Sequence, residues 1–95
     1  MTITYHAVFQ FDPDGICISF PDAPLAITCA DTPEKGIAMA KDVLILALHK
    51  TAAADLPADT AARMNTESNQ ELVPITVEME VRDGILFHES VIDLR

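Results

Sequence analysis

Apolar and polar residues alternate along two long stretches of the chain, which predicts β-strands with one apolar face. In residues 3–11 the odd positions are apolar, and residues 73–81 show the most regular alternation in the sequence. Residues 16–20 and 26–29 are shorter apolar runs bounded by proline or other turn residues. The pattern therefore predicts four strands.

The segments between the strands carry turn and helix signals. Residues 12–15, Asp-Pro-Asp-Gly, combine a proline of fixed φ with a glycine that tolerates positive φ, so the first two strands are predicted to form a hairpin. Residues 31–34, Asp-Thr-Pro-Glu, supply capping oxygens before a proline suited to the first helical turn, with the spacing of a capping box. Apolar residues then recur at helical spacing to about residue 50, and Pro57 forbids further helix.

The remaining segments give weaker signals. Residues 51–71 contain few large apolar side chains and are predicted to be a loose connection with one helical turn at residues 59–64. Residues 85–94 fit either a fifth strand or a short terminal helix. Because 95 residues supply only one hydrophobic core, we expect a single α+β domain over residues 1–95. Its elements follow in β-β-β-α-β order, with a small, mainly antiparallel sheet and one main helix on one face.

Charge changes the picture of possible partners. Fifteen acidic residues against six basic ones give a net charge of -9, which repels phosphate backbones and attracts basic partners. The same charge also serves simply to keep a small domain in solution. The longest apolar run, residues 43–48, is too short to cross a bilayer, and the first residues lack the basic start of a secretion signal. We therefore expect a cytoplasmic protein without a membrane partner.

The residue types that carry catalysis or bind metals are not grouped in the sequence. Cys17 and Cys29 lie inside apolar strand-like runs and are predicted to be reduced and buried, and the three histidines lack the spacing of metal ligands. The aspartates fall in turns, in a proline loop and at a helix start, where each has an ordinary structural role. We expect neither an enzyme nor a bound metal or cofactor.

Several motifs occur together in one order. Residues 5–15 form the first strand and its Pro-Asp-Gly turn, residues 19–24 read Ser-Phe-Pro-Asp-Ala-Pro, and residues 31–40 begin Asp-Thr-Pro-Glu and continue through Ala-Met-Ala. This order and spacing resemble the N-terminal domain of the HicB antitoxin family, well over residues 3–60 and loosely at 73–81. The resemblance implies a partial RNase-H-like fold, in a protein that binds and blocks a small basic HicA-type mRNA endoribonuclease.

The chain also departs from the family pattern. Family members usually carry leucine, glycine and cysteine where this chain has Ala23, Leu25 and Ala26, and a Glu-Ala pair where it has Lys35-Gly36. Many continue into a DNA-binding segment, for which the fourteen residues after position 81 are too short. We therefore expect no specific DNA binding by this chain alone.

The candidate partner-binding residues lie in two places. A rigid loop presents side chains with little entropy left to lose on binding, and acidic side chains on the polar face of the last long strand suit a basic partner. These candidates are Phe20, Pro21, Asp22 and Pro24 in the loop, and Glu78 and Glu80 on the strand. An equally simple reading packs Phe20 into the core, uses Asp22 as a cap and leaves the two glutamates solvated.

Two functions remain open at the level of sequence. The first is an antitoxin that blocks a HicA-type toxin, and the second is an orphan HicB-like module that binds a small molecule or a regulator without a toxin partner. An apolar pocket with convergent polar groups favours the second, and three or more converging carboxylates favour an enzyme. The apolar residues 43–48 exceed what one buried stripe requires, so a homodimer or higher homo-oligomer is also expected.

Overall fold

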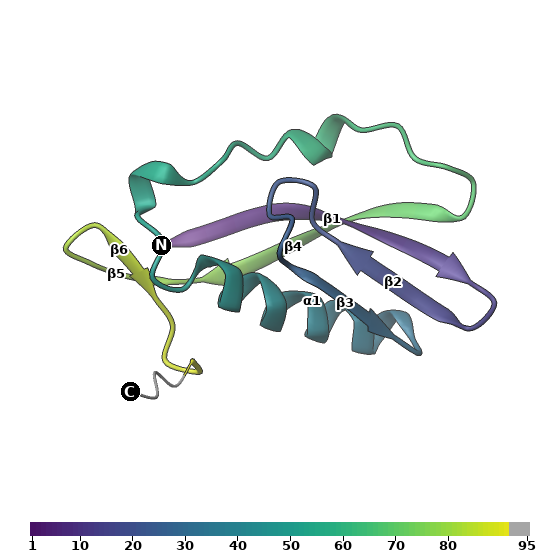
Figure 1. Cartoon of the computed structure of the whole chain (residues 1–95), viewed down its shortest axis with the longest axis horizontal. Coiled ribbons are helices and arrows are strands. Elements are labelled where there is room, and N and C mark those ends of the chain that lie inside the picture. The colour runs from purple at the N-terminus through teal and green to yellow at the C-terminus, as the bar shows by residue number, and fades with distance from the viewer. Residues whose placement is uncertain (92–95) are drawn as a thin grey trace.

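The chain folds into a four-stranded antiparallel sheet with one long helix packed against it, as the computed structural model shows (Figure 1). The structure describes residues 1–91. Its strands and helix are β1 (Thr2–Asp12), β2 (Gly15–Ser19), β3 (Ile27–Ala30), α1 (Pro33–Leu48), β4 (Gln70–Glu78), β5 (Glu80–Arg82) and β6 (Ile85–Phe87). The predicted α+β class and β-β-β-α-β order are confirmed, and a small β5–β6 hairpin follows them.

The strand order in the sheet is β3-β2-β1-β4. The long β1 lies in the centre and pairs with β4 from Thr2 to Gln10, but it pairs with β2 only from Val8 to Asp12. The first half of β1 therefore has no strand beside it on the β2 side. Other parts of the chain fill that place, and they form the candidate site described below.

The core lies between the sheet and α1. Alternate residues of the three long strands point toward the helix and are buried, as their alternation predicts: Ile3, Tyr5, Ala7 and Phe9 of β1, Ile16 and Ile18 of β2, and Ile75 and Val77 of β4. Gly36 lets the helix approach closely, because a Cβ atom there would lie 2.9 Å from the Phe9 ring and 3.1 Å from Cδ1 of Ile18. The largest fully buried side chains are Phe9, Phe20, Ile18, Leu44, Ile75 and Leu86.

Helix α1 begins and ends close to the predicted positions. The Thr32 side chain caps the start by accepting a hydrogen bond from the Lys35 amide at 3.2 Å, and Pro33 occupies the first helical position. The capping oxygen thus comes from Thr32 and not from the neighbouring aspartate of the predicted capping box. The helix ends at Leu48, and Lys50 takes a left-handed φ of 68°.

The fourth strand differs from the prediction at both ends. It runs from Gln70 to Glu78 and not over residues 73–81, and Val81 lies on β5 with 43% of its surface exposed. The pairing with β1 ends at Glu78 because β1 itself begins at Thr2. Beyond it, a turn at Asp83 and Gly84, both with positive φ, folds β6 back onto β5.

The sequence allowed either a strand or a short helix over residues 85–94, and the hairpin decides part of this range. A strand forms at Ile85–Phe87, whereas residues 92–94 lie outside the described residues. The hairpin is held to the body of the protein by backbone hydrogen bonds, from Lys50 N to Leu86 O at 2.6 Å and from Leu86 N to Thr51 O at 2.8 Å.

The prediction that both cysteines are buried is wrong. Cys17 and Cys29 are exposed free thiols. Alternation explains this, because Ile16 and Ile18 point toward the helix and Cys17 between them must point the other way. Cys29 is the partner of Cys17 in the register of β2 and β3, so it lies on the same exposed face.

The connection from α1 to β4, predicted to be loose, runs along the opposite side of β1 and β4 from the helix in Figure 1. It carries two short 3-10 turns, at Ala53–Asp55 and Thr60–Arg63. Ala61 is fully buried, so this part of the connection packs against the sheet.

Candidate functional site

The proline loop, residues 20–26, is fixed at both ends and projects in its middle. Phe20 and Ala26 are each only 1% exposed, and two successive turns are closed by the Ala23 amide on Phe20 O at 3.0 Å and the Ala26 amide on Ala23 O at 2.8 Å. Leu25, between these anchors, is 94% exposed. The loop therefore holds a leucine out in solvent on a rigid base.

Asp59 takes the place of β2 beside the first half of β1. The His6 amide donates a hydrogen bond to Asp59 Oδ1 at 3.0 Å, and the Nδ1 atom of His6 lies 2.6 Å from Asp59 Oδ2. A side chain thus satisfies a strand amide that no neighbouring strand reaches. This contact fixes the connection against the sheet.

Asp22 joins the proline loop to the same connection. Its carboxylate accepts a hydrogen bond from the Thr60 hydroxyl and another from the Ala61 amide, the latter at 2.9 Å. Burial alone would raise the pKa of Asp22, but the hydrogen bonds from Thr60 and Ala61 outweigh it and lower that pKa below its ordinary value. The carboxylate therefore stays charged and clamps two segments that are far apart in sequence.

The Tyr5 side chain lies near both Asp22 and Asp59. Its buried hydroxyl donates a hydrogen bond to the carbonyl oxygen of Pro57. Burial, together with the negative charges of Asp22 and Asp59, raises the pKa of Tyr5. The phenol therefore remains protonated and acts as a structural donor.

A small apolar hollow of about 170 Å³ opens between the proline loop, the end of α1 and the connection. Its walls include Tyr5, Asp22, Pro24, Leu25, Leu48 and Pro57. Sites for drug-sized ligands usually measure about 300–1,000 Å³, so this hollow suits a single side chain of a partner better than a free ligand. Its polar groups are already bonded within the chain, as shown above for Tyr5 and Asp22.

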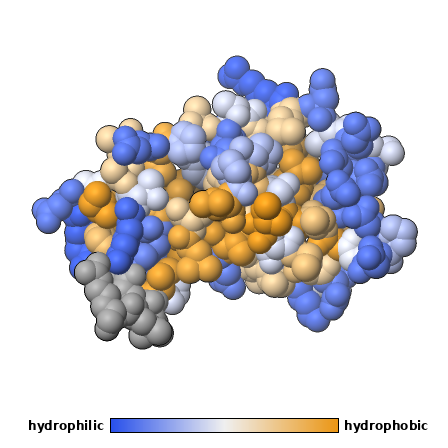
Figure 2. Space-filling view, viewed as in Figure 1, coloured by the Kyte–Doolittle hydropathy of each residue, from blue (hydrophilic) through white to orange (hydrophobic). Residues whose placement is uncertain are grey.

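Apolar side chains are exposed on one face of the molecule. Figure 2 shows them gathered in the middle of this face, with hydrophilic residues toward both ends. The most exposed large apolar residues apart from Leu25 are Ile27 on β3 and Leu46 on α1, which are 61% and 60% exposed. Ile27 directly follows the proline loop in sequence, whereas Leu46 borders a separate hollow with Asp42 and Val91. An exposed apolar residue beside a projecting loop is typical of a protein-binding surface.

Glu78 and Glu80, the other two candidates, lie apart from the loop. They border a separate hollow together with Met79, Phe87 and His88. The Glu78 carboxylate accepts a hydrogen bond from the Thr2 hydroxyl, which lowers its pKa, and Glu80 lies 3.7 Å from the Nε atom of Arg82. Both glutamates remain exposed, so their charge faces solvent.

Among residues 1–91 there is no group of three or more His, Cys, Asp or Glu side chains that could hold a metal ion. Nor does any helix in that range have the length and apolar character needed to cross a membrane.

The comparison with known proteins agrees with the motifs. No family model matches the chain. Antitoxin HicB 2 of Photorhabdus laumondii is 44% identical to it over 43 residues. This chain resembles the HicB antitoxins. The matched stretch makes up 45% of the chain but only 31% of the length of that HicB protein, so the likeness covers part of each.

The HicB-like sequence pattern located the loop but not its most prominent residue. Pro21 and Pro24 are exposed, whereas Phe20 is buried and Asp22 is bonded within the chain. Leu25 carries the exposed apolar surface of the loop, and its position in the sequence indicates this exposure. A large apolar residue directly after the second proline of a short loop has no strand or helix to bury it.

Proposed function

We propose that this protein is an antitoxin that binds a small basic HicA-type mRNA endoribonuclease and blocks it by covering its RNA-binding surface. The observation that carries this proposal is the rigid proline loop, with Leu25 projecting beside an apolar hollow, in a chain that is similar to Antitoxin HicB 2. Blocking requires binding alone, and this protein supplies no chemical step.

The apolar centre and the acidic charge have different roles in this proposal. Leu25 and the hollow supply a central contact that excludes water, which is where binding energy concentrates in protein interfaces. The net charge of -9, with Glu78 and Glu80 exposed, speeds encounter with a basic partner and disfavours RNA itself. Affinity is therefore expected to fall as salt is added.

A small-molecule binding module is the weaker alternative. At the loop this reading is weaker because the hollow there is small, and the Tyr5 hydroxyl and the Asp22 carboxylate in its wall bond to the chain itself. A larger hollow of about 410 Å³ lies away from the loop, between the β1–β2 turn and the start of α1.

The test is calorimetric titration of the protein with the product of a neighbouring short basic gene, at low and high salt, with an RNA-cleavage assay of that product. We expect tight, salt-weakened binding that stops cleavage. Replacing Leu25 by serine should weaken binding by about 2 kcal/mol, roughly thirtyfold, without changing stability, because the side chain is exposed.

The matched control is Val81→Ser, which removes an exposed aliphatic side chain from the β5–β6 hairpin and should leave the affinity unchanged. Absence of binding by the unmodified protein overturns the antitoxin proposal. If Leu25→Ser binds the toxin as tightly as the Val81→Ser control does, the proline loop is not the centre of the interface.

A further inference from the structure

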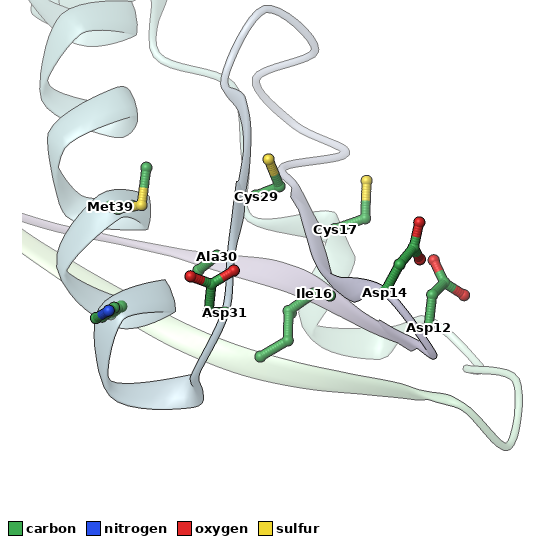
Figure 3. A pocket seen from close by; sticks show the side chains of 10 residues that line it. Asp12, Asp14, Ile16, Cys17, Cys29, Ala30, Asp31 and Met39 are labelled. Atoms are coloured by element: carbon green, nitrogen blue, oxygen red, sulfur yellow. The ribbon is translucent and has the colours of Figure 1, made fainter.

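Two exposed thiols lie opposite each other on adjacent strands. Cys17 of β2 and Cys29 of β3 are register partners, and both are free and exposed. Figure 3 shows their side chains projecting from the two strands toward the same side of the sheet. Nothing in the proposed toxin binding uses them.

The hydrogen-bond register decides how close such a pair lies. Asp12 and Gly15 flank a two-residue hairpin loop, so they form a hydrogen-bonded pair, and Gln10 with Cys17 is the next such pair of β1 and β2. The Phe11 amide agrees with this, because it bonds on the opposite side of β1, to Asn69 O at 2.8 Å.

The backbone groups of Cys17 therefore point toward β1, which makes Cys17 and Cys29 a non-hydrogen-bonded pair of β2 and β3. In pairs of this type the Cα atoms are about 4.5 Å apart and the side chains come closest. That separation lies at the short end of the range found in disulfides, about 4.4–6.8 Å.

We propose that Cys17 and Cys29 form a dithiol site that reacts with low-molecular-weight disulfides to close an intramolecular disulfide. One thiolate attacks a sulfur atom of the small disulfide, forms a mixed disulfide and releases the first small thiol. The other cysteine then attacks the protein sulfur of that mixed disulfide, forms the Cys17–Cys29 bond and releases the second small thiol. The two cysteines lose two electrons and two protons, and the small disulfide gains them as two thiols.

The charged residues around the two thiols should determine which small disulfides react fastest. The thiols border a hollow of about 410 Å³ whose walls also include the carboxylates of Asp12, Asp14 and Asp31. Lys35 provides one positive charge at the same hollow. A neutral disulfide should therefore react faster than the anionic disulfide of glutathione, and added salt should narrow the difference.

Closing the bond affects the proline loop, because residues 20–26 lie within the ring between the two cysteines. A covalent link that restrains the unfolded chain raises stability. For a ring of this size we expect the melting temperature to rise by about 12–24 °C. This inference does not depend on the antitoxin proposal, since its test involves no toxin.

The experiment treats the full chain with 2-hydroxyethyl disulfide, blocks the remaining thiols with an alkylating reagent and measures the intact mass. We expect a product that has lost two hydrogen atoms, takes up no alkyl group, remains uncrosslinked to other chains and melts at a higher temperature until dithiothreitol is added. Peptide mapping should place the bond between Cys17 and Cys29.

The single variants Cys17→Ser and Cys29→Ser are the controls. Each retains one exposed thiol, which should stop at the mixed disulfide and show no rise in melting temperature. The proposal is overturned if the unmodified protein keeps two alkylatable thiols, stops with a mixed disulfide on each cysteine, or forms disulfides only between chains. Equal rates with neutral and anionic disulfides would refute the role of the three carboxylates.

Discussion

Replacing Asp22 by alanine tests the clamp between the proline loop and the connection. The substitution removes the acceptor of two hydrogen bonds, from the Thr60 hydroxyl and from the Ala61 amide. Ala61 is fully buried, so its amide loses its partner in a place where water reaches it poorly. We expect both the stability of the protein and the order of the loop to fall.

The size of the effect follows from these two bonds. Hydrogen bonds to charged groups contribute about 1.5–3 kcal/mol each when well buried. Because Asp22 is only half-buried, we assign about 1 kcal/mol to each bond and expect a loss of about 2 kcal/mol in the free energy of unfolding. In a domain of this size that corresponds to a fall of about 8–16 °C in melting temperature.

The assay is urea and thermal unfolding followed by circular dichroism. Asp22→Asn keeps an oxygen that can accept the Ala61 bond and should lose only about half as much stability, or about 1 kcal/mol. Asp42→Asn is the matched control, because Asp42 is an exposed carboxylate on α1, and it should stay within about 0.5 kcal/mol of the unmodified protein. An Asp22→Ala variant as stable as the control would refute the clamp.

Three further predictions concern the same core and loop. Gly36→Ala should lower stability by about 1 kcal/mol in urea unfolding, because crowding against Phe9 and Ile18 outweighs the gain in helix propensity; a more stable variant would contradict the close approach. Tyr5→Phe should cost about 1 kcal/mol by removing the hydrogen bond to Pro57, and an unchanged melting temperature would show that this bond contributes nothing. The lowered pKa of Asp22 means that its contribution is complete above the unfolded pKa of about 3.9 and is lost as pH falls through the lower folded value. The stability gap between the unmodified protein and Asp22→Asn should therefore be constant above about pH 5 and shrink below about pH 4, whereas a gap that persists into strong acid would contradict this assignment.

Local pattern determined most of the elements. Alternation located the strands, the Pro-Asp-Gly turn predicted the first hairpin, and Thr32-Pro33 marked the start of the helix. These features depend on neighbouring residues, so a single sequence carries enough information for them. The likeness to HicB antitoxins was visible for the same reason, since its motifs are short and local.

Errors arose where the direction of a side chain depends on distant segments. Both cysteines lie in apolar runs, yet the face of the sheet that α1 covers is set by Phe9, Ile18 and Gly36, and the cysteines point to the other face. Val81 continues the alternation of β4, but the chain leaves the sheet before it. An alternating pattern defines two faces, and only packing decides which of them is buried.

The candidate site shows the same division. The sequence by itself determined that a short proline-bracketed loop exists, that it follows a strand ending in Phe20, and that the chain is strongly acidic. Only the tertiary structure decided that Asp22 bonds the proline loop to the connection, that Asp59 bonds the connection to β1, and that Leu25 projects from the loop. The physical reason is that β2 no longer pairs with β1 beyond Ser19, which leaves the His6 amide without a strand partner. Asp59, about forty residues after Ser19 in sequence, accepts the hydrogen bond from that amide.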